Sequence, residues 1–190
     1  MNPLPFILLA ISLPLLLGGC GEKEVNFEEL EQRESIWYLI DSDTPYTGKV
    51  FLFHYNGNKE MKGNYKDGKK DGLYEGWYGN GQKKFVKTYK NGKAEGVYVW
   101  WYENGQKESE ENLKDGKLDG LSVSWHNNGQ KRNEGNLKDG YNDGLWSWWY
   151  ENGQKEREIN VKNRKLVGLT VAWHENGQKS SEVNYKDGKK

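Results

Sequence analysis

The sequence is poor in several residue types that common protein classes need. Its 190 residues include one Cys, three His, two Met and four Pro, and only 34% of positions are apolar. A single Cys excludes an internal disulfide framework and a Cys-rich metal site. The 28 basic and 28 acidic residues cancel, whereas a nucleic-acid binder needs a basic surplus to displace counterions. Wholesale disorder is also excluded, because nine Trp and twelve Tyr are far more than disordered chains carry.

A long apolar run is found only at the N-terminus. Residues 4–17 are almost entirely apolar, and Leu17-Gly18-Gly19-Cys20 follows before the chain turns polar. The run is shorter than the roughly 20 apolar residues of a membrane span, and it suits the core of a secretory signal. The closing four residues resemble a bacterial lipobox, although residues 1–19 contain no Lys or Arg. The alternative is an ordinary signal peptide followed by an incidental Cys.

The lipobox resemblance implies a location and an anchor. It implies a signal peptide over residues 1–19, a lipidated Cys20 and a tether over residues 20–35. With two or more acyl chains, such an anchor holds a protein firmly in a membrane. We therefore expect a lipid-anchored protein of the cell envelope. Because Gly21 rather than Asp follows the Cys, the resemblance favours the outer membrane if the cell is Gram-negative.

The chain beyond residue 47 is one unit written six times. Gly recurs every 24 residues in three series, which together take 17 of the 24 Gly. A fixed period of this kind indicates a repeat array. We number each copy from its first Gly as position 0, so that position 5 is aromatic and positions 8 and 9 are Asn and Gly in all copies. The copies are residues 48–71, 72–95, 96–119, 120–143, 144–167 and 168–190, preceded by an atypical cap unit at residues 36–47.

Each copy has the composition of a β-hairpin. Asn-Gly and Asp-Gly accept the positive φ of tight turns, and the Trp, Tyr and Val between them favour strands. The sequence therefore predicts an all-β fold, an elongated single-layer antiparallel meander of about twelve strands. Strands are expected at positions 1–6 and 11–17 of each copy. We expect three-residue loops at both turns, because they would place positions 1, 5 and 17 on one face and 6, 12, 14 and 16 on the other.

The repeat resembles a known family. A unit such as Asp143-Gly144-Leu145-Trp146-Ser147-Trp148-Trp149-Tyr150-Glu151-Asn152-Gly153-Gln154-Lys155 strongly resembles the MORN repeat variant of bacterial proteins labelled as the YwqK antitoxin family. The resemblance covers about residues 36–190, and Trp37 to Gly48 look like that family's atypical first unit. The resemblance implies an elongated, twisted sheet of hairpins. The antitoxin label does not indicate which residues act or how.

Nothing in the sequence points to catalysis. His54, His126 and His174 all stand at position 6, and copies lie about 10 Å apart, so these side chains cannot share a metal or a proton. Asp pairs such as Asp67 and Asp71 flank turns without the spacing of a Ca²⁺ loop. Glu110, Glu134, Glu158 and Glu182 recur once per copy, which predicts ion pairs with neighbouring strands rather than a cleft. We expect no enzyme, no metal and no cofactor.

The remaining candidate site is a stripe of aromatic side chains at position 5. Its members are Phe53, Trp77, Trp101, Trp125, Trp149 and Trp173. Exposed apolar stripes usually mark binding, although Trp side chains also stack to hold a thin sheet together. The leading hypothesis is a lipid-anchored scaffold that binds a protein partner and no nucleic acid. The alternatives are an immunity lipoprotein that neutralises an envelope-acting toxin, and binding of glycan or peptidoglycan by the stripe.

Overall fold

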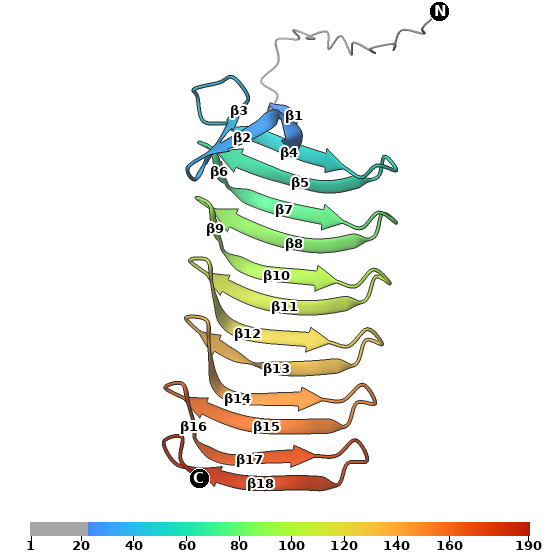
Figure 1. Cartoon of the computed structure of the whole chain (residues 1–190), viewed down its shortest axis with the longest axis vertical. Coiled ribbons are helices and arrows are strands. Elements are labelled where there is room, and N and C mark those ends of the chain that lie inside the picture. Colours follow the sequence, from blue (N-terminus) through green and yellow to red (C-terminus); the bar gives the residue numbers. More distant parts are fainter. Residues whose placement is uncertain (1–22) are drawn as a thin grey trace, which may run out of the picture.

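The computed structural model describes residues 23–190. The predicted signal peptide and Cys20 lie outside the described residues. Figure 1 shows the strands stacked one after another along the long axis of the molecule, in sequence order from the blue to the red end. The predicted all-β single open meander is confirmed. Within residues 23–190 no helix is long and apolar enough to span a membrane.

Twelve principal strands make up the repeat array, two from each copy. They are β4 (Gly48–Phe53), β5 (Lys59–Lys66), β7 (Gly72–Trp77), β8 (Lys83–Lys90), β10 (Gly96–Trp101), β11 (Lys107–Lys114), β12 (Lys117–Trp125), β13 (Lys131–Lys138), β14 (Tyr141–Trp149), β15 (Lys155–Lys162), β17 (Gly168–Trp173) and β18 (Lys179–Tyr185). Three short strands extend hairpins: β6 (Lys69–Lys70), β9 (Lys93–Ala94) and β16 (Lys165–Leu166). All neighbours among these strands pair antiparallel, in the order in which they occur in the chain.

The first turn of each copy is a three-residue loop that ends on Gly. In copy 1 the His54 N–H donates to the Asn58 carbonyl at 2.8 Å, and the Gly57 N–H donates back to the His54 carbonyl at 2.9 Å. Gly57 has a φ of 83°, which only Gly adopts without cost. This turn follows the expected geometry.

The second turn differs from the expectation. Asp67 and Gly68 both have positive φ, at 49° and 71°, and the flanking Lys66 and Lys69 pair directly. Two central residues with positive φ define the two-residue hairpin turn that Asp-Gly favours. In copy 5 the Gly is replaced by Arg164, which keeps a φ of 62°.

The predicted assignment of faces is wrong in part. In copy 3 Trp101 pairs with Lys107, but Trp100 pairs with Ser109, so Glu108 is an extra residue in a β-bulge. This bulge shifts the pairing of the two strands by one residue. All six copies contain the same bulge. Positions 1 and 5 do share a face, but position 17 lies on the opposite one. Position 12 also lies apart from positions 14 and 16, because the Arg132 side chain reaches Ser124 at position 4.

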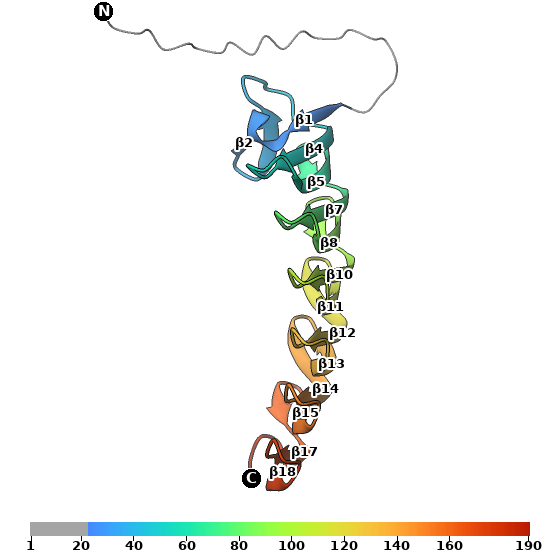
Figure 2. The same cartoon turned by 90° about the vertical axis from the view of Figure 1, so that its right-hand side faces the viewer.

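The sheet therefore has two faces of different composition. We call the side with positions 1, 3, 5, 11, 14 and 16 the ladder face, because each position there forms a row from copy to copy. The other side, with positions 0, 2, 4, 13, 15 and 17, is the cap face. Figure 2 shows the N-terminal segment lying on one side of the sheet, beside its first strands.

That N-terminal segment is folded where a tether was expected. Residues 24–33 form β1 (Glu24–Asn26), the 3-10 turn η1 (Phe27–Glu29) and β2 (Leu30–Arg33), and β2 pairs with β3 (Ile36–Leu39). β1 adds a parallel strand beside β4. The tether prediction for residues 20–35 is therefore wrong from Glu24 onward, because apolar side chains of this segment supply part of the core.

The most buried part of the molecule lies beneath this cap. Its buried cluster consists of Val25, Leu30, Tyr46, Val50, Tyr65 and Tyr74. The Tyr46 hydroxyl donates to the Lys49 carbonyl at 2.7 Å, and burial raises the pKa of Tyr46 to about 12. Beyond the cap the array is a single layer, so its stability must come mainly from contacts between adjacent copies.

Candidate functional site

The predicted aromatic stripe lies on the ladder face, and Lys side chains cover most of it. In four places the position-11 Lys ammonium of one copy lies over the position-5 Trp of the next copy. The distances to the ring are 5.6 Å for Lys59 and Trp77, 5.3 Å for Lys107 and Trp125, 5.3 Å for Lys131 and Trp149, and 5.7 Å for Lys155 and Trp173. Cation–π contacts of this kind stabilise exposed sites by about 0.5–1 kcal/mol each. Trp101 is half-buried in the same row, while Phe53, in the first copy, is 48% exposed.

Three of these four Lys residues are held by carboxylates within their own copy. The Lys107 ammonium lies 2.7 Å from Glu110, the Lys155 ammonium lies 2.6 Å from Glu158, and Lys131 and Glu134 form the equivalent ion pair. Trp125, Trp149 and Trp173 are therefore each covered by a Lys that a Glu keeps in place. Trp and Glu share a face for this reason, although the sequence suggested that they would be separated. The structure thus favours a role for the stripe in joining copies.

Two of the three His residues, His54 and His126, take part in the same contacts between copies. The Tyr102 hydroxyl at position 6 donates to the Trp125 carbonyl of the next copy at 2.8 Å. His126 stands at the equivalent position, and its Nε2 lies 2.8 Å from the Trp149 carbonyl. A carbonyl oxygen can only accept, so Nε2 must carry a proton there. His54 makes the same contact with the Trp77 carbonyl at 2.9 Å.

The Asn residue of the first turn has two tasks. In copy 5 the Asn152 Oδ1 accepts from the Gln154 N–H at 2.9 Å, which shapes the turn. Its Nδ2 donates to the Glu175 carbonyl of the next copy at 2.8 Å. This cross-copy hydrogen bond is repeated at Asn80, Asn104 and Asn128. Asn stands at position 8 in every copy because the turn needs an acceptor and the contact with the next copy needs a donor. Asn provides both on one short side chain.

The ladder face also carries an exposed aliphatic row that is separate from the stripe. It consists of position 1 in copies 2 to 6, with exposed fractions of 44% for Leu73, 47% for Val97, 42% for Leu121, 57% for Leu145 and 50% for Leu169. We call it the aliphatic row. Position 16, which is Thr88 in copy 2 and Asn in copies 3 to 5, lies between its members, and the Asn112 amide donates to the Leu121 carbonyl at 2.8 Å. The regular Leu or Val at position 1 was the sequence signal for this row, which was expected to share a face with positions 5 and 17.

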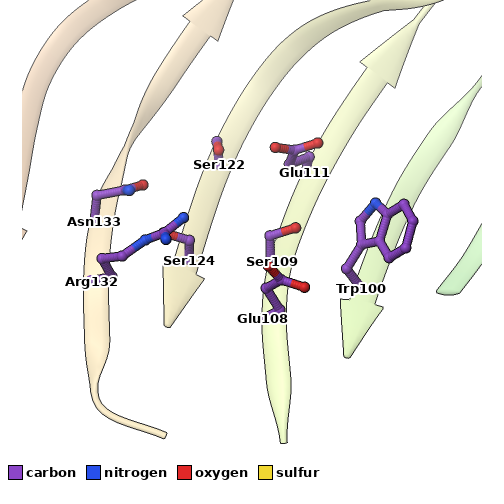
Figure 3. A pocket seen from close by; sticks show the side chains of 8 residues that line it. All are labelled: Trp100, Glu108, Ser109, Glu111, Ser122, Ser124, Arg132 and Asn133. Atoms are coloured by element: carbon purple, nitrogen blue, oxygen red, sulfur yellow. The ribbon is translucent and has the colours of Figure 1, made fainter. Parts of the chain in front are cut away.

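A polar hollow lies on the cap face, above β10, β11, β12 and β13. Its volume is about 400 Å³, and it is lined by Trp100, Glu108, Ser109, Glu111, Ser122, Ser124, Arg132 and Asn133. Figure 3 shows Trp100 at one side and Arg132 at the other, with the three Ser residues between them. The Arg132 Nε donates to the Ser124 hydroxyl at 3.2 Å. None of these residues was a candidate from sequence.

Burial changes the ionisation of the groups beside this hollow. Burial raises the pKa of the Glu111 carboxyl, and the nearby Lys87 ammonium opposes that shift. Burial lowers the pKa of Lys87 itself. The Lys87 ammonium lies 4.3 Å from the centre of the Tyr98 ring, so it faces an aromatic side chain rather than a carboxylate.

Two further predictions concern the lipidation site and metal binding. Cys20, the expected lipidation site, lies outside the described residues. In residues 23–190 no group of three or more His, Cys, Asp or Glu side chains is placed to hold a metal ion.

Comparison with known families identifies the type of repeat. The family model described as the MORN repeat variant matches residues 46–67, 70–91, 94–115, 142–163 and 166–187. The fourth copy, between the third and fourth matched segments, is outside the match. No curated protein matches the chain.

Proposed function

The chain belongs to the MORN repeat variant family, and we propose that it is a non-enzymatic scaffold that binds a protein partner along its ladder face. The observation that carries this proposal is the aliphatic row. Five Leu or Val side chains, each 42–57% exposed, stand one per copy on a rigid sheet. At about 10 Å per copy the row is about 40 Å long. A row of exposed apolar side chains of this length on one face of a protein favours a binding site for another macromolecule.

The shape of the row indicates the kind of partner. Between two successive members the surface forms a shallow socket of about 350 Å³, lined in part by Leu121, Leu145 and Trp149. A partner that fits presents aliphatic side chains at about 10 Å intervals, as a helix does with residues seven apart on one face. The Lys–Glu pairs beside the row provide a polar rim, which is the usual arrangement around an apolar centre of an interface.

The absence of enzymatic activity is part of the proposal. Two of the three His side chains, His54 and His126, are engaged by carbonyl oxygens of the next copy. The ladder of Glu side chains is paired with Lys. These groups are therefore used to join copies, which leaves them poorly placed to exchange protons with a substrate.

We also propose that the protein is anchored in the cell envelope by a lipid on Cys20, in the outer membrane if the cell is Gram-negative. The first strand begins at Glu24, and four residues span at most about 14 Å. A lipid on Cys20 would therefore hold the cap and the first copy close to the membrane surface. Cys20→Ser is expected to release the protein from membranes. Membrane retention of that variant in a fractionation experiment would refute the anchor while leaving the scaffold proposal untouched.

Site-specific photocrosslinking in the native cell tests the scaffold proposal. A photoreactive residue in place of Leu145 is expected to capture a defined partner that mass spectrometry can identify. Tyr141 is the matched control, because it lies on the same strand, is 48% exposed and is outside the row. Equal capture from both positions, or from neither, would argue against a partner on this face. A captured toxin would favour the immunity function implied by the antitoxin label.

A further inference from the structure

The hollow on the cap face exists because copy 4 departs from its neighbours. Positions 2 and 4 of the repeat point into the cap face. In copies 3 and 5 they are aromatic: Tyr98 and Trp100, then Trp146 and Trp148. In copy 4 they are Ser122 and Ser124. Two small side chains thus replace two large ones, and an open space of about 400 Å³ results.

The floor of the hollow provides hydroxyl groups that the protein does not use fully. Ser122 is 8% exposed, and within residues 23–190 its hydroxyl makes no hydrogen bond and remains accessible to solvent from the hollow. Ser109 lies on the adjacent strand β11 and also faces the hollow (Figure 3). A ligand that enters the hollow would remove water from this hydroxyl and must therefore form a hydrogen bond with it.

The walls add charged groups and one aromatic surface. Arg132 uses its Nε on Ser124, and its two terminal nitrogens make no hydrogen bond or ion pair with any described residue. Glu111 forms no ion pair within the described chain, and its pKa is raised by burial. Trp100 closes the side toward copy 2, where its ring packs against Phe85 at 5.3 Å between centroids. The hollow thus offers donors, acceptors and an indole surface together.

We propose that this hollow binds a neutral sugar unit. A pyranose ring has an apolar C–H surface that suits an indole, and hydroxyls that both donate and accept, as Ser, Asn, Arg and Glu require. The two carboxylates of Glu108 and Glu111 outnumber the single guanidinium of Arg132, which disfavours a phosphate or other anion. An aliphatic side chain would leave the Ser122 hydroxyl and the Arg132 nitrogens desolvated and unpaired.

Other features of the chain agree with a specialised copy. The fourth copy is the one that the family model does not match. It keeps the joining groups of the ladder face, including Trp125, Lys131 and Glu134, so the departure is concentrated on the cap face. The site lies on the opposite face from the aliphatic row, so the sugar proposal and the scaffold proposal stand independently.

Calorimetric titration of the purified protein with cellotetraose, maltotetraose and chitotetraose tests the proposal. At least one of these oligosaccharides is expected to bind with a Kd of about 1 mM or tighter, and inorganic phosphate is expected not to bind. Trp100→Ala should weaken binding by about tenfold, because it removes the stacking surface. Ser124→Trp should abolish binding by filling the hollow, as Trp100 and Trp148 fill the same position in adjacent copies.

Two further variants keep the test decisive. Arg132→Ala shortens a surface side chain without filling space, so it should fold normally and still weaken binding. Trp125→Ala removes a Trp of the same copy from the ladder face, and it should leave sugar binding unchanged. Failure of all three oligosaccharides to bind, or binding that survives Ser124→Trp in a folded protein, would overturn the proposal.

Discussion

The cross-copy hydrogen bond of the first turn leads to a prediction with an internal control. Asn152 makes two hydrogen bonds, one to Gln154 within its turn and one to the Glu175 carbonyl of the next copy. A hydrogen bond contributes about 0.5–1.5 kcal/mol net. Asn152→Ala loses both and should lower the free energy of unfolding by about 2 kcal/mol. Asn152→Asp keeps the acceptor, loses the donor and should cost about 1 kcal/mol.

Asn176 at the last copy is the matched control. It accepts from the Gln178 N–H at 3.0 Å, but its amide donates to no described residue. Asn176→Asp should therefore change the free energy of unfolding by less than about 0.5 kcal/mol. Urea unfolding followed by both far-UV circular dichroism and Trp fluorescence provides the values, and coincident curves would show that the array unfolds as one unit. An equal cost for Asn152→Asp and Asn176→Asp would refute the cross-copy role.

Three further predictions follow from other contacts. His126→Tyr should leave stability unchanged, whereas His126→Phe, which loses the donor to the Trp149 carbonyl, should cost about 1 kcal/mol in urea unfolding. Gly135→Ala should cost about 1–3 kcal/mol, because the new Cβ would lie 2.2 Å from the Trp146 ring. Burial raises the pKa of Tyr46 from 10.0 to about 12, so its contribution is complete below pH 10 and is lost between pH 10 and 12. Circular dichroism across that range should show falling stability, and Tyr46→Phe should flatten the fall.

The sequence predicted the architecture because the repeat encodes it locally. Gly57 and Gly68 stand at positive-φ turn positions, and the residues between the turns favour strands. The 24-residue period sets the stacking of copies. These features depend on one hairpin at a time, so the confirmed meander could be derived from residue types and spacing alone.

The register could not be derived in the same way. Glu108 is an extra residue in a bulge, but its residue type carries no signal for one, and a single extra residue exchanges the faces of a strand. The prediction therefore placed Trp and Glu on opposite faces. The structure places them together, because Lys107 connects a Glu of its own copy with Trp125 of the next.

The hollow depends on this register as well. Ser122 and Ser124 are visible in the sequence as departures from the aromatic residues of adjacent copies. Only the pairing of β11 with β12, and of β12 with β13, brings them together with Glu111 and Arg132. A comparison of copy 4 with copies 3 and 5 alone would have drawn attention to these two Ser residues.

The most direct test of the scaffold proposal uses the aliphatic row itself. Leu121→Asp with Leu145→Asp places two charges on the row, at positions where both side chains are exposed, so the fold should be retained. Once the partner captured at position 145 is known, its affinity for the wild-type and doubly substituted proteins can be measured by titration. We predict at least a tenfold loss of affinity, since two apolar contacts would become desolvated charges. Unchanged affinity would contradict the proposal that the ladder face binds the partner.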